Sequence, residues 1–217
     1  MAYPTVSAPY GLKPINLIGG QVFAGSTREL PIQYGYATNI FYGDFVVLSR
    51  GFATRAAVST GTGSNQVTGV FLGCSYTNPL TKQKTFSQYW PASTLAGDAV
   101  AIVCDDPDTV FKAVVCSSGT TVASGGLALI GTNLSMIDNS TGNVNTGDST
   151  NAVLAPTATP VTSILPVRCV GVVPDTSYSF AATGSSSTTA ITLTGTGTPQ
   201  AIPVGASVGY LASNGQL

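Results

Sequence analysis

The chain has 217 residues, of which only 8% are charged, and it carries a net charge of −1 with no histidine. Proteins that capture nucleic acid need many Lys and Arg phosphate contacts, and Ser-His-Asp or Cys-His catalysis needs histidine, so this composition excludes those two catalytic sites and argues against nucleic-acid binding. With 43% hydrophobic residues the chain is too apolar for a disordered segment, and it is long enough for one large β domain or two small ones.

The low charge allows two explanations, and both stay open at the level of sequence. Soluble domains usually contain about 25% charged residues, and charged surfaces keep proteins soluble as monomers. Either Ser, Thr and Asn side chains replace the charges on the surface, or much of the surface meets other subunits. The sequence contains no run of 18 apolar residues, so no membrane span is predicted. The first residues, MAYPTVSAPYGLKP, do not resemble a signal peptide.

Residues 1–27 are predicted to be an extended N-terminal arm. Pro4, Pro9 and Pro14 favour extended backbone there. The segment also carries apolar side chains, so we expect it to lie on another surface rather than to be a floppy tail.

Short apolar runs separated by turns predict β-strands in most of the remaining chain. The predicted strands cover residues 28–34, 45–48, 67–74, 96–104, 111–116, 161–173 and 204–211. Residues 96–104 and 111–116 are predicted to form a hairpin around the turn at 105–108. No ten-residue stretch shows a helical period with caps. The predicted fold is all-β, a β-barrel or β-sandwich with the N-terminal arm and little or no helix.

Composition divides the chain into three predicted regions: an arm at 1–27, a β domain at 28–116, and a Ser/Thr/Gly-rich second half at 117–217. The second half either completes the same barrel or forms a distal lobe. Seven of the eight Lys and Arg residues lie at or before Lys112. Such asymmetry suggests that residues 1–116 face a charged partner and that 117–160 and 183–198 point outward or toward neighbours.

The sequence predicts no enzyme and no cofactor. The cluster Asp105-Asp106-Pro107-Asp108 lacks the glycine and final glutamate of a calcium loop. The four cysteines, Cys74, Cys104, Cys116 and Cys169, form no CxxC pair, so no zinc site is expected. Three of them sit inside apolar runs, so we predict buried free thiols in a protein made in a reducing cytoplasm.

Several stretches, taken in order, resemble structural proteins of tailed double-stranded-DNA bacteriophages. They are AYPTVSAPYGLKPINLIGGQVFAGSTREL, IFYGDFVVL, GVFLGCSYTNP, QYWPAST and CDDPDTVFKAVV, with LPVRCVGVVPDT as a weaker match. The sequence is most similar to head decoration (cement) proteins of phages that infect cyanobacteria and other aquatic bacteria. The resemblance covers residues 2–116 well and 164–175 weakly.

The resemblance implies a β-rich protein on the outer capsid, commonly a trimer, that clamps neighbouring major-capsid subunits after the head expands. The expected partners are the major capsid protein and further copies of the chain, with no nucleic acid and no membrane. The alternative is a head-surface adhesin that binds host carbohydrate through its Thr-rich C-terminal half. The residues expected to contact the capsid or other subunits are Tyr3, Tyr10, Leu12, Lys13, Ile15, Arg28, Arg50, Arg55, Lys82, Lys84 and Trp90.

Overall fold

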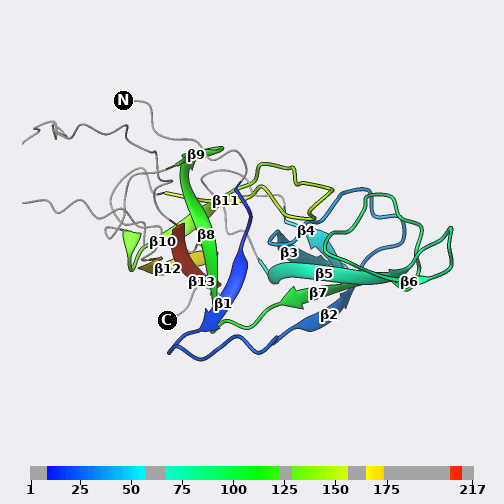
Figure 1. Ribbon diagram of the computed structural model, residues 1–217, viewed down its shortest axis with the longest axis horizontal. Coiled ribbons are helices and arrows are strands. Elements are labelled where there is room, and N and C mark those ends of the chain that lie inside the picture. The colour runs from blue at the N-terminus through cyan, green and yellow to red at the C-terminus, as the bar shows by residue number, and fades with distance from the viewer. Residues whose placement is uncertain (1–8, 57–66, 123–128, 156–164, 174–205, 212–217) are drawn as a thin grey trace, which may run out of the picture.

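The computed structural model describes residues 9–56, 67–122, 129–155, 165–173 and 206–211. These residues form two β-sheets with almost no helix, which confirms the predicted all-β fold class. Figure 1 shows the two sheets side by side, and we call them the barrel lobe and the sheet lobe. None of the residues that the structure describes belongs to a helix that could span a membrane.

The barrel lobe is built from β1 and from the strands after residue 108. Its strands are β1 (Lys13–Leu17), β8 (Thr109–Ser118), β9 (Thr121–Val122), β10 (Asn133–Ile137), β11 (Ala152–Leu154), β12 (Val167–Val172) and β13 (Ala206–Leu211). The pairings run β8–β11–β10–β12–β13 and return to β8, so the sheet closes on itself. Only β8 and β11 run parallel in this circuit. The strand predicted at 204–211 is confirmed as β13, and it closes the barrel.

The sheet lobe contains the six strands between β1 and β8. They are β2 (Arg28–Pro31), β3 (Phe45–Ser49), β4 (Phe52–Arg55), β5 (Gly69–Thr77), β6 (Lys84–Ser87) and β7 (Val100–Cys104). β5 lies in the middle, with β7 along one edge and β3 and β6 end to end along the other. A tight turn at Arg50 and Gly51, both with positive φ, joins β3 to β4.

The predicted hairpin of residues 96–104 and 111–116 is wrong. β7 pairs with β2 and β5, so both of its edges are occupied and none remains for β8. Residues 105–108 instead carry the chain from the sheet lobe to the barrel lobe. The lobes therefore do not follow the expected boundaries at 27 and 116: the barrel takes β1 from the expected arm and β8 from the expected β domain.

One hydrophobic core is shared by the two lobes. Phe45, Val70 and Cys104 come from the sheet lobe, and they pack in the same cluster as Phe111 and Met136 of the barrel. Leu12, which belongs to the expected arm, is also in this cluster and is 0% exposed. The described part of the expected arm is thus an integral part of the barrel, while residues 1–8 lie outside the described residues.

A second core lies on the other face of the sheet lobe. Trp90 is 0% exposed, and its backbone is held there by an isolated antiparallel β-bridge to Ile40. Its ring meets that of Tyr76 edge-on at 5.4 Å between centroids, and its indole N–H donates to the carbonyl of Tyr36. The four cysteines are free and buried, as predicted. Burial raises the pKa of the Cys74 thiol to about 12 and that of Cys116 to about 11.

The contrast between Leu12 and Ile15 gives a direct test of this integration. We expect Leu12→Ala to lower the free energy of unfolding by about 2–5 kcal/mol, because it opens a cavity in the shared core. Ile15→Ala, on the partly exposed side of β1, is the matched control and should change stability far less. Urea unfolding of both variants measures this. Equal small effects would show that the segment does not contribute to the core.

Candidate functional site

The residues expected to make contacts are spread over the molecule rather than gathered at one site. Leu12 and Trp90 are fully buried, and the side chain of Arg55 is only 10% exposed. The hydroxyl of Tyr10 is buried without a hydrogen-bond partner among the described residues, and burial raises its pKa to about 12. Tyr3 lies outside the described residues.

The basic residues among them differ in how they are paired. Arg28 pairs with Asp105, and Lys84 Nζ lies 3.2 Å from Asp98 Oδ2. Lys82 and Arg50 are exposed in turns, and no ion pair within the described residues involves either. Exposed ion pairs such as that of Lys84 contribute little to stability. The charges of Arg28, Lys84, Lys82 and Arg50 therefore remain available to a partner.

The two lobes meet where the segment before β1 passes closely beside the segment before β3. Gly11, just before β1, and Gly43, just before β3, both have positive φ. A Cβ on Gly43 would lie 2.7 Å from the Leu12 nitrogen, and one on Gly11 would lie 2.8 Å from the Gly43 oxygen. Only glycine allows this approach, and the Leu12 N–H then donates to the Gly43 carbonyl at 3.1 Å.

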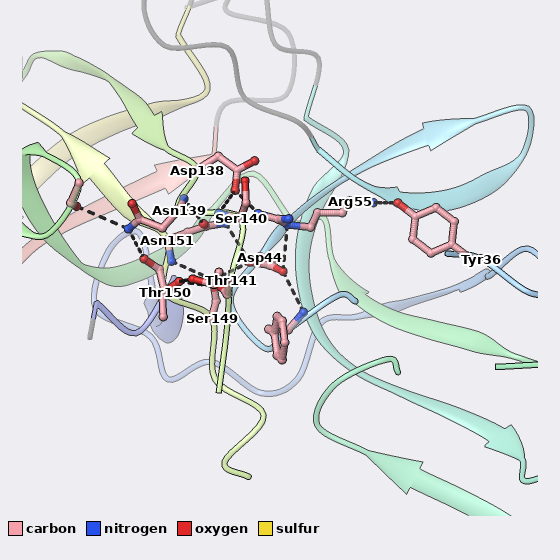
Figure 2. A network of polar contacts seen from close by, with 12 residues as sticks. Tyr36, Asp44, Arg55, Asp138, Asn139, Ser140, Thr141, Ser149, Thr150 and Asn151 are labelled. Carbon is pink, nitrogen blue, oxygen red and sulfur yellow. Dashed lines mark hydrogen bonds and ion pairs between the residues drawn. The ribbon is translucent and has the colours of Figure 1, made fainter. Parts of the chain in front are cut away.

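A buried polar network fills the junction beside these glycines (Figure 2). Asp44 is 0% exposed and accepts three hydrogen bonds. The Phe41 N–H donates to Oδ2 at 2.8 Å, while the Ser149 hydroxyl and the Asn151 amide donate to Oδ1 at 2.5 and 2.8 Å. The last two residues lie more than a hundred positions further along the chain, so Asp44 joins the sheet lobe to the barrel lobe.

Arg55 at the end of β4 lies between two carboxylates. Its Nε is 3.5 Å from Asp44 Oδ2, and its Nη2 bonds to Asp138, which follows β10. The Arg55 Nε is buried and makes no hydrogen bond to any of the described residues. The backbone N–H of Arg55 donates to the Tyr36 hydroxyl at 3.0 Å. We call Asp44, Arg55, Asp138, Ser149 and Asn151 the junction network.

Burial raises the pKa of Asp44 to about 6, because desolvation outweighs the hydrogen bonds from Ser149 and Phe41 and the charge of Arg55. The neighbouring carboxylate of Asp138 acts in the same direction as burial. A carboxyl group with a perturbed pKa in a cleft is a candidate acid or base. Asp44, however, has no exposed surface, and its hydrogen bonds come from groups of its own chain.

A second polar cluster lies at the surface near the junction. Lys13 Nζ is 2.5 Å from Asp148 Oδ1 and 3.7 Å from the centre of the Tyr42 ring. The Gln88 amide donates to the same Asp148 oxygen at 3.1 Å. Desolvation lowers the pKa of Lys13, and the hydrogen bond and charge of Asp148 oppose that shift.

A shallow open groove of about 520 Å³ begins beside this cluster. It follows the face of the sheet lobe on which Ile102 of β7 and Phe86 of β6 lie, and its lining residues are Tyr42, Leu72, Gly73, Cys74, Phe86, Ser87, Gln88 and Ile102. Phe86 is 77% exposed, and Leu80 in the nearby β5–β6 turn is 90% exposed. No strand of the described residues pairs with the outer edge of β6. The groove is thus mainly apolar and borders a free strand edge.

Sequence reasoning missed both the junction network and the groove. In the sequence, Asp44 is a single aspartate between a glycine and an apolar strand, which gives no sign that Ser149 and Asn151 will reach it. The groove residues come from three strands and the segments around them. Among the described residues, no cluster of three or more Cys, Asp or Glu side chains is placed to hold a metal ion.

Comparison with protein-family models, with curated proteins and with solved structures finds no match for this chain.

Removing Arg55 should be strongly destabilising. Arg55→Ala leaves Asp44 and Asp138 buried without their shared counter-ion, and breaking a buried pair costs about 3–5 kcal/mol. Lys84→Ala, which breaks an exposed pair, is the control and should leave the unfolding midpoint almost unchanged. Chemical denaturation at pH 7.5 compares the two. Similar midpoints for both variants would mean that the junction network does not stabilise the fold.

Proposed function

We propose that the protein is a structural virion protein, a decoration (cement) protein that binds the outside of an expanded phage head as a homotrimer. In this role it clamps neighbouring major-capsid subunits. The sequence resemblance supports the proposal, and an all-β fold with few charges suits a protein whose surface is covered by other subunits. The structural observation that supports it best is the apolar groove beside the free edge of β6.

The groove has the properties of a protein-binding surface. Exposed aromatic side chains such as Phe86 contribute most when a partner buries them, and full burial of such a side chain is worth about 1.5–3 kcal/mol. An unpaired strand edge offers backbone N–H and C=O groups to an extended segment of another chain. We therefore assign the groove and β6 to the contact with the major capsid protein.

The proposal is tested by decoration of purified heads. Expanded heads that lack the protein are mixed with the purified chain, and bound copies are counted by gel densitometry and located by cryo-electron microscopy. We expect saturation at a copy number that scales with the capsomers, with the protein at three-fold positions. Sparse occupancy at unique sites, or retention on host glycans instead of heads, would support the adhesin and contradict the cement role.

Groove substitutions test which surface makes the contact. We expect Phe86→Ser to weaken head binding about 10- to 100-fold, which corresponds to the loss of one buried aromatic side chain. The matched control is Leu95→Ser, an exposed apolar residue next to Ala96 of the core on the other face of the sheet lobe. Unfolding curves of both variants should match the parent protein. Unchanged binding by Phe86→Ser would remove the groove from the proposed interface.

A further inference from the structure

The junction network buries more negative than positive charge. Asp44 and Asp138 share the single guanidinium of Arg55, whose side chain is 10% exposed. Asp138 receives the direct hydrogen bond, whereas the Arg55 Nε remains 3.5 Å from Asp44 without one. When both acids are ionised, the three side chains together carry one uncompensated negative charge. Burying such a charge is costly, and taking up one proton removes it.

Among the described residues, no cation other than Arg55 compensates Asp44 fully. The charge of Lys13 in β1 attracts the Asp44 carboxylate, but the Lys13 amine donates its hydrogen bond to Asp148. The remaining groups that face Asp44 are neutral donors: the Phe41 N–H, the Ser149 hydroxyl and the Asn151 amide. These donors favour the carboxylate, and desolvation opposes them. The Ser149 hydroxyl can turn to accept a hydrogen bond once Asp44 is protonated.

We propose that the junction network is a proton-operated latch, which joins the barrel lobe to the sheet lobe more firmly in mildly acidic than in neutral or alkaline solution. The latch is independent of the capsid role proposed above. Through this latch, the protonation state of the buried Asp44 side chain would set how rigidly the barrel lobe and the sheet lobe are held together.

The direction follows from linkage. The pKa of Asp44 rises from 3.8 to about 6 on folding, so the native protein binds this proton more tightly than the unfolded chain. The contribution to stability is therefore complete below about pH 4. It is lost as the pH rises through the folded value.

Thermal unfolding between pH 5 and pH 7.5 tests the latch. We expect the melting temperature of the parent protein to rise by roughly 5 °C as the pH falls across this range. Asp44→Asn cannot titrate and should abolish most of that rise. Asp98→Asn is the control and should retain it, because hydrogen bonds from Thr77 hold the pKa of the exposed Asp98 well below its usual range. An Asp44→Asn protein with the same rise as the parent would overturn the proposal.

A second measurement needs no substitution, and it decides the question if Asp44→Asn does not fold. The side-chain carboxyl carbons of the aspartates can be followed by NMR in the parent protein from pH 4 to pH 8. We expect one buried aspartate to titrate well above the others. We also expect amide exchange at Phe41 and Asn151, corrected for its intrinsic pH dependence, to become slower as that group is protonated. Titration of every aspartate at or below pH 4 would overturn the proposal.

Discussion

The burial of the Asp44 carboxylate is the constraint on which the arrangement of the two lobes depends. A carboxylate without exposed surface must receive its hydrogen bonds from its own chain. Two of its donors, Ser149 and Asn151, belong to the segment that leads into β11, and the third is a backbone N–H of the sheet lobe. The network is complete only when both lobes are folded and in contact, so it couples the formation of one lobe to that of the other.

The backbone beside Asp44 has to permit this contact. Gly11 and Gly43 bring the segments before β1 and β3 close enough for the Leu12 N–H to donate directly to the Gly43 carbonyl. The shared hydrophobic core lies next to the same crossing, with Phe45 immediately after Asp44 and Leu12 immediately after Gly11. Polar and apolar contacts therefore act at one place. Either lobe alone would expose apolar surface and leave Asp44 short of donors.

The proposed interface begins near the junction, at Tyr42, and extends from there along the sheet lobe to β6. The junction residues are buried and paired within the chain, whereas Phe86 in β6 and Leu80 between β5 and β6 are strongly exposed. Figure 1 shows β6 at the end of the sheet lobe that lies away from the barrel lobe. A buried, internally paired junction beside an accessible groove suits the proposed decoration role, which needs a rigid body and an accessible contact surface. Lys13 and Arg55 show that the number of basic residues in a segment does not tell how many of them are free to bind a partner. Both are basic residues of the N-terminal half, yet each is held by a carboxylate of the barrel segment.

The sequence alone determined the fold class, because alternating and continuous apolar runs without a helical period are local properties of the chain. It also located the last strand, β13, and predicted the free, buried cysteines. Pairing was decided only in three dimensions. Residues 96–104 and 111–116 look like a hairpin locally, but β2 and β5 occupy both edges of β7, and β8 completes a barrel instead. The partners of Asp44 were equally invisible, since a hydrogen bond across more than one hundred residues exists only once the closed barrel carries Ser149 and Asn151 to the sheet lobe.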